Sequence, residues 1–351
     1  MTQSEAPPLP ANAPVPGAPA PGGTRVTLAE VARLAGVSPT TVSHVLSGKR
    51  MVGEATRGNV QAAIQKLGYR PNNIARSLRT SRSRMVAVVV PDITSPFYSV
   101  LTRGLADAVY EAGYGTYVCN SDGLAERENT FVEDVLDRGV DGIVMASTNL
   151  ASGGMGPSGP GTPIVYIGGA FDHPQADLVR TDDEEGSRLA TAHLAARGAT
   201  RIAMIQGPPE AGSARDEGYR VALAASGIEF DPELMVHGDW SRAGGSRAMQ
   251  ALLSLPQPPD AVFCANDLTA IGAVDAIRKA GLSIPDDIAV TGFDDADVAT
   301  IVSPALTTVR NPAYDTGRTA GALLLNRMLG EYTEDNRTVV LPCTLVERES
   351  A

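Results

Sequence analysis

The chain has 351 residues, of which 43% are apolar and 20% charged, as in a soluble globular protein with room for a small module and two larger lobes. Its three cysteines are far apart and do not have the spacing of metal ligands, which argues against a disulfide framework and favours reduced thiols in the cytoplasm. No apolar run reaches membrane-spanning length, which excludes a membrane-embedded protein. The net charge of −11 is divided unevenly: residues 24–84 hold eleven basic and two acidic residues, a balance of +9, while residues 85–351 carry −19. A basic head on an acidic body indicates nucleic-acid binding at one end only.

Residues 1–23 form a tail rich in proline, alanine and glycine, with seven prolines. The tail lacks the basic start and the apolar centre of a secretion signal. Such a composition cannot bury enough apolar surface to order itself, so we expect disorder. The sequence does not indicate what the tail does.

Residues 26–46, VTLAEVARLAGVSPTTVSHVL, predict two short helices joined by a tight turn. The apolar face of the first helix is expected to comprise Leu28, Val31, Ala32 and Leu34. Gly36 suits the left-handed residue after a helix, and Ser38 is a good N-cap for the second helix. That helix should expose Pro39, Thr40, Thr41, Ser43 and His44 and bury Val42, Val45 and Leu46. The pattern is typical of a helix-turn-helix, although an ordinary helical hairpin with a polar surface would share it.

A third amphipathic helix is predicted over residues 54–67, followed by GYRPNNIARSLRTSRSR. Together with VTLAEVARLAGVSPTTVSHVLSG, this segment closely resembles the lactose-repressor (LacI/GalR) family of bacterial transcription regulators. The resemblance extends over about residues 25–348. It implies an all-α DNA-binding headpiece over residues 24–70 and a hinge helix in residues 71–84.

The resemblance also implies which residues contact DNA. These are Thr27, Ser38, Pro39, Thr40, Thr41, His44, Arg50, Asn73, Ala75, Arg76, Leu78 and Arg79. Many relatives carry arginine where His44 stands, so His44 contacts either a base edge or a phosphate. In the family the hinge becomes helical in the minor groove, where Leu78 of each subunit would insert into a base step and kink the duplex. The alternative for the hinge is a plain basic linker.

Residues 85–351 alternate between apolar strand-like runs, such as MVAVVVPD, and helix-like segments. This alternation predicts βαβ units with parallel sheets covered by helices on both faces. The number of units is too large for one sheet, so two doubly wound lobes are expected. The family arrangement is an α/β bilobal fold of the periplasmic-binding-protein type I, with the chain crossing between lobes near residues 181, 310 and 332. The first lobe would then hold residues 85–180 and 311–332, and the second lobe residues 181–310 and 333–351.

Several polar and aromatic residues follow strands of these lobes, where open α/β sheets bind ligands. They are Asp92, Phe97, Tyr98, Arg215, Trp240, Asn266 and Asp294. Aromatic faces together with paired polar groups suit a sugar ring, and in the family the matching positions line the cleft that binds effector. Other roles remain open: Trp240 as a core residue, Arg215 in a surface ion pair, Asn266 and Asp294 as loop caps, and Asp92 in a turn.

No catalytic centre or cofactor site is predicted. Residues 154–159 fit the dinucleotide-binding pattern G-x-G-x-x-G, but the prolines at 157 and 160 forbid the helix that this pattern needs. The histidines are scattered, and the acidic run at 182–185 is interpreted as a solvated helix start.

The sequence therefore predicts a ligand-responsive transcription regulator, most simply a repressor, that binds a quasi-palindromic operator at the cytoplasmic nucleoid. A homodimer is expected because no heptad tail follows LPCTLVERES. The predicted effector is a small molecule, with a sugar favoured by Trp240. A purine-type corepressor is the alternative, and a solute-binding protein is a more distant one.

Overall fold

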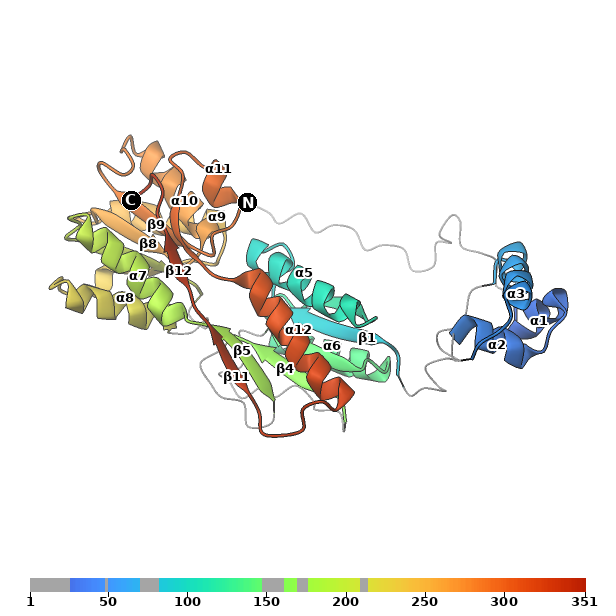
Figure 1. Ribbon diagram of the computed structural model, residues 1–351. Helices are drawn as coiled ribbons and strands as arrows, with labels where there is room; N and C mark the ends of the chain where they lie inside the picture. Colours follow the sequence, from blue (N-terminus) through green and yellow to red (C-terminus); the bar gives the residue numbers. More distant parts are fainter. Residues whose placement is uncertain (1–25, 48–49, 70–81, 147–160, 169–175, 209–213) are drawn as a thin grey trace. The chain divides into compact units, whose positions relative to one another are not determined.

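The computed structural model describes residues 26–47, 50–69, 82–146, 161–168, 176–208 and 214–351 (Figure 1). The chain forms two compact units that divide after Arg79, a headpiece (residues 26–69) and a body (residues 82–351). No helix in these ranges is long and apolar enough to cross a membrane. The predictions for the tail, for residues 71–81 of the predicted hinge at 71–84 and for the glycine-rich segment at 154–159 lie outside the described residues.

Three helices make up the headpiece: α1 (Leu28–Ala35), α2 (Pro39–Ser47) and α3 (Glu54–Leu67). The first helix begins with a capping box, in which the Thr27 hydroxyl accepts a hydrogen bond from the Glu30 amide at 3.3 Å and the Glu30 carboxylate accepts from the Thr27 amide at 2.7 Å. Gly36 ends it in the left-handed conformation, with φ of 66°. The three helices enclose a small core of Val31, Ala32, Val42, Val60, Ala63 and Tyr69.

Two apolar residues of the headpiece are not where the sequence pattern placed them. The exposed fraction of Leu34 is 44% and that of Leu46 is 39%, so the prediction that both face inward is wrong. Leu34 lies two residues beyond the buried Ala32, which rotates it by about 200° around the helix. Leu46 lies in the last turn of α2. Both side chains are available to a partner.

The first lobe of the body is a six-stranded sheet with helices on both faces (Figure 1). Its strand order is β11-β5-β4-β3-β1-β2, from β11 (Thr338–Leu341), β5 (Asp177–Thr181), β4 (Ile164–Ile167), β3 (Gly142–Ala146), β1 (Met85–Val90) and β2 (Gly115–Asn120). Val86, Val88 and Val90 pack toward α5 (Pro96–Glu111) and α12 (Ala313–Leu329), whereas Ala87 and Val89 pack toward α6 (Ala125–Asp137). Burial on both faces explains why MVAVVV is continuously apolar.

The second lobe repeats this architecture. Its strand order is β12-β10-β9-β8-β6-β7, from β12 (Thr344–Val346), β10 (Thr307–Arg310), β9 (Ala289–Phe293), β8 (Ala261–Cys264), β6 (Ile202–Gln206) and β7 (Met235–His237). One face is covered by α9 (Arg242–Leu253) and α10 (Asp267–Lys279), the other by α7 (Asp183–Ala196) and α8 (Ala214–Ala225). Two short helices, η2 (Pro232–Leu234) and α11 (Val298–Ile301), complete the described part of this lobe. The predicted pair of doubly wound lobes is confirmed.

Three connections join the two lobes of the body. The chain leaves the first sheet at β5 and enters α7, returns from β10 to α12, and leaves again from β11 to β12. The first two connections agree with the predicted crossings near 181 and 310. The third lies between Leu341 and Thr344, not near residue 332, because β11 pairs in parallel with β5. The predicted assignment of residues 333–351 to the second lobe is therefore wrong for β11.

Candidate DNA-binding and effector sites

Four of the predicted DNA-contacting residues, Ser38, Pro39, Thr40 and Thr41, lie at the start of α2, whereas Thr27 caps α1 and His44 lies in the last turn of α2. Pro39 and Thr40 are exposed in its first turn, and Thr41 and His44 are partly buried. The Ser38 hydroxyl accepts a hydrogen bond from the Thr41 amide at 3.1 Å and lies 2.9 Å from the Thr41 hydroxyl. Ser38 thus caps α2 and Thr27 caps α1, whether or not either residue also contacts DNA.

Arg50 is exposed beyond the end of α2. The other five predicted contacts, Asn73, Ala75, Arg76, Leu78 and Arg79, lie outside the described residues. The described headpiece therefore presents a helix N-terminus with short polar side chains, which is a surface that a major groove can accept.

In the body, the strand order fixes where a ligand can enter. β1 lies between β2 and β3, and β6 lies between β7 and β8, so the direction in which strands are added to each sheet reverses at its central strand. Such switch points are where open α/β sheets bind ligands, beyond the carboxyl ends of the strands. Asp92 follows β1, Asn266 follows β8 and Asp294 follows β9.

Arg215, in the first turn of α8, contacts several of the predicted effector residues and their neighbours in the second lobe. These residues are called the cluster below: Asp183, Arg215, Trp240, Asn266, Phe293, Asp294 and Asn311. Arg215 Nε donates to Asp183 Oδ2 at 3.0 Å, and another guanidinium nitrogen donates to the carbonyl of Ala265. The guanidinium carbon lies 3.8 Å from the ring centroid of Phe293 and 5.6 Å from that of Trp240. With 17% of its side chain exposed, Arg215 is not the surface ion-pair residue that the sequence left open. Its contacts with two aromatic rings and its hydrogen bonds hold the guanidinium in place.

Trp240 has a positive φ of 62°, which is rare for a bulky residue. Its ring packs on Gly207 so closely that a β-carbon at Gly207 would lie 2.2 Å from a ring atom. The Asn266 amide donates to the Trp240 carbonyl at 3.1 Å, while Asn266 Oδ1 accepts from the Thr269 amide and caps α10. Asn266 is thus a helix cap that also holds Trp240.

Asp294 also has a positive φ, of 105°. Its Oδ1 accepts from Asn311 Nδ2 at 3.2 Å, and its other carboxylate oxygen accepts no hydrogen bond from the described residues. Burial raises the pKa of Asp294 to about 6, although the charge of Arg215 opposes this. A backbone conformation with positive φ costs free energy at both Trp240 and Asp294, and residues with such strained backbone are often found at functional sites.

The first lobe contributes Tyr98 and Phe97, whose rings meet edge to face with centroids 5.2 Å apart. Burial raises the pKa of Tyr98, so the phenol stays neutral and can donate a hydrogen bond, and Arg215 and Asp294 both act on it electrostatically. Asp92 is exposed and its Oδ1 accepts from the Thr94 amide and hydroxyl at 2.8 and 2.7 Å, which is the turn role that the sequence left open.

Three residues of the cluster were not predicted: Asp183, Phe293 and Asn311. The acidic run at 182–185 does start a helix, because Asp182 accepts from the Glu185 amide and caps α7. Asp183, however, turns to Arg215 instead of solvent. Aromatic faces, a fixed guanidinium and a buried carboxylate with an available oxygen suit a ring that carries hydroxyl groups.

Parts of both units match described protein families. Residues 27–72 match the family described as "Bacterial regulatory proteins, lacI family", and residues 191–351 match a periplasmic binding protein-like domain. The ribose operon repressor of Escherichia coli (strain K12) is 38% identical over 329 residues, which cover 93% of this chain and 99% of the repressor. The chain belongs to the lacI family.

Solved structures of lacI-family proteins are similar over the same length. A complex of the transcriptional regulator CelR with cellobiose is 35% identical, with a TM-score of 0.70, and covers 93% of this chain and 100% of its own. The lac repressor dimer bound to operator and an anti-inducer is 28% identical, with a TM-score of 0.82, and covers 93% and 99%. This lacI-family chain is therefore a DNA-binding transcription regulator, and the relatives described here are regulators and not enzymes.

Proposed function

We propose that the protein is a cytoplasmic repressor that binds a quasi-palindromic operator as a homodimer and responds to a sugar bound among Tyr98, Arg215, Trp240, Asn266 and Asp294. The observation that carries the sugar assignment is the Arg215 guanidinium, which packs on the rings of Phe293 and Trp240 and interacts electrostatically with the half-buried Asp294 carboxylate. The names of the relatives support it, since one represses a ribose operon and another was solved with cellobiose.

The response follows from the connections between the lobes. A sugar held by Tyr98 from the first lobe and Arg215 from the second binds best when the lobes stand at one particular angle. It can change operator affinity only by binding that state more tightly than the other. A coupling free energy of about 1–3 kcal/mol would change operator affinity roughly 5- to 150-fold.

The sugar assignment is tested by thermal unfolding of the full chain against a panel of pentoses, hexoses, disaccharides, sugar phosphates and nucleobases. A ligand at 100 times its Kd should add about 2.7 kcal/mol to the free energy of unfolding. We expect a free sugar to give this shift and Trp240→Ala to abolish it. A shift from a nucleobase alone would contradict the sugar assignment and favour a corepressor.

The DNA-binding assignment is tested with an operator selected from a random-sequence duplex library by the full chain. Thr40→Ala and His44→Ala should each weaken operator binding by about 1–3 kcal/mol, because each removes a side chain facing the groove. Gln65→Ala, at an exposed position of α3 that no prediction places on DNA, is the matched control. Equal affinities for all three variants would contradict the proposed placement of α2 in the groove.

A further inference from the structure

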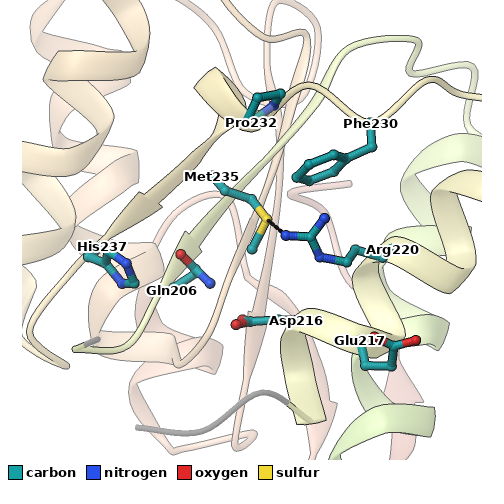
Figure 2. Close-up of a pocket in the computed structure, with 8 residues that line it drawn as sticks. All are labelled: Gln206, Asp216, Glu217, Arg220, Phe230, Pro232, Met235 and His237. Atoms are coloured by element: carbon teal, nitrogen blue, oxygen red, sulfur yellow. Dashed lines mark hydrogen bonds between the residues drawn. The ribbon is translucent and has the colours of Figure 1, made fainter. Parts of the chain in front are cut away.

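A pocket of about 430 Å³ opens on the second lobe, and none of the seven predicted effector residues lines it (Figure 2). Its floor is the end of β6 and β7, one wall is the first two turns of α8, and the other wall is the segment before β7. The lining residues are Gln206, Asp216, Glu217, Arg220, Phe230, Pro232, Met235 and His237. Nothing in the proposed sugar response uses these side chains.

Gln206 is a buried polar group on the floor of this pocket. Only 9% of the residue is exposed, and its side-chain amide makes no hydrogen bond with any described residue. Figure 2 shows the amide pointing into the pocket, between His237 and Asp216. The amide oxygen and nitrogen are not fully enclosed, so an unpaired amide faces the space of the pocket and is available to a ligand.

The charges around the pocket favour a cation. Asp216 and Glu217 form no ion pair within the described part of the chain. The only guanidinium in the lining belongs to Arg220, which stacks on the Phe230 ring at 3.8 Å and donates to the Met235 sulfur at 3.3 Å. The lining therefore carries two carboxylates against one guanidinium, which lies on the apolar wall, so its balance of charge is negative. A phosphate or another anion would be repelled, whereas an ammonium group would be attracted.

We propose that this pocket is a second small-molecule site, specific for an organic cation with a primary ammonium group, such as a short diamine. Asp216 and the Gln206 carbonyl oxygen accept hydrogen bonds from the ammonium group, and Glu217 supplies charge at the rim.

The pocket is joined to the proposed sugar site by the backbone. Gln206 precedes Gly207, on which the Trp240 ring packs, and the Gly207 carbonyl lies 3.0 Å from His237 Nδ1. Asp216 follows Arg215 in the first turn of α8. A diamine in the pocket therefore changes the surroundings of Trp240, and by linkage it changes sugar affinity as well.

The test is a titration of the full chain with 1,4-diaminobutane, followed both by calorimetry and by fluorescence of Trp240, the only tryptophan in the sequence. We expect saturable binding with a change in tryptophan fluorescence. Asp216→Asn and Gln206→Met should each raise the Kd about fivefold or more. Asp286→Asn removes an exposed carboxylate outside the pocket and should leave the Kd unchanged. Thermal unfolding establishes that each variant is folded.

Three results would overturn the proposal: no saturable heat with the diamine, equal affinities for Asp216→Asn and Asp286→Asn, or equally tight binding of inorganic phosphate. The titration needs neither sugar nor DNA. Trp240→Ala should retain diamine binding by calorimetry, so failure of the proposed sugar response and failure of this site are distinguishable.

Discussion

Replacing Asp177 by alanine should lower the free energy of unfolding of the body by about 3–5 kcal/mol, the usual cost of breaking a buried ion pair by removing one partner. The Asp177 side chain is 0% exposed, and its two oxygens accept hydrogen bonds from Arg327 and Arg337 at 2.6 to 3.1 Å and from the Arg337 amide at 2.9 Å. Two mostly buried guanidiniums would be left without their carboxylate. Denaturant unfolding measures the effect.

The matched control is Glu111→Ala. Glu111 pairs with Arg318 at 3.1 Å, but 64% of its side chain is exposed, so its loss should cost within about 1 kcal/mol. Asp177 lies in β5, Arg327 in α12, and Arg337 immediately before β11. Their hydrogen bonds therefore hold the edge of the first sheet, where β11 pairs with β5. Similar costs for the two variants would show that Asp177 does not hold this edge.

The Asp177 carboxylate also makes the free energy of unfolding of the body depend on pH. Burial alone would raise the pKa of Asp177, but hydrogen bonds from the two arginines outweigh burial and bring the pKa to about 2. A lowered pKa stabilises the folded state above the unfolded-state pKa of about 3.9. This contribution is lost as pH falls from about 4 through 2, and the Asp177→Ala variant should lack that part of the acid transition.

The fold was largely predictable because buried parallel strands leave a strong pattern. Val86 to Val90 are all fully buried, as the continuous apolar run predicted. The pattern failed for β7, a strand of three residues that are only partly covered. It also failed for α9, in which Gly244 and Gly245 lower helix propensity. Gly245 is required by packing, because a β-carbon there would lie 2.2 Å from the Thr269 carbonyl of α10.

The candidate site was predictable to a lesser degree. The positions of Arg215, Trp240 and Asn266 follow from motifs at strand ends, and the structure brings them together with Asp294. The partners of Arg215 leave no local signal, since Asp183 is 32 residues away in sequence and Phe293 comes from another strand. Only the folded chain shows that Asp183 faces a guanidinium, or that Gln206 lines a pocket.

Asp294→Asn should abolish most of the sugar response while stabilising the free protein. Asparagine keeps the shape and an oxygen for Asn311, and it tolerates positive φ better than most residues. It cannot, however, provide a charged acceptor for a sugar hydroxyl. Hydrogen bonds to charged groups contribute about 1.5–3 kcal/mol, so affinity for the sugar identified in the panel should fall about 10- to 100-fold. Calorimetry with that sugar measures the loss.

The gain in stability follows from the raised pKa of Asp294. Burial raises this pKa to about 6, so between about pH 4 and 6 the folded wild type holds a proton that the unfolded chain has released. Stability of the wild type therefore falls as pH rises through this window, and the asparagine variant should gain about 1–3 kcal/mol relative to it by pH 7. Burial is the main cause of the raised pKa of Asp267, and the charge of Asp294 raises it further. The substitution therefore also removes an unfavourable interaction between the two carboxyl groups.

Asp286→Asn, an exposed carboxylate of the same lobe, should leave both the sugar affinity and the pH profile unchanged. If Asp294→Asn instead bound the sugar as tightly as the wild type, the carboxylate would be a loop cap and not a ligand group. A variant that lost sugar binding without gaining stability would show that Asp294 is already solvated in the free protein. Gain of stability together with loss of binding is the result expected for a buried charge that is retained for its ligand.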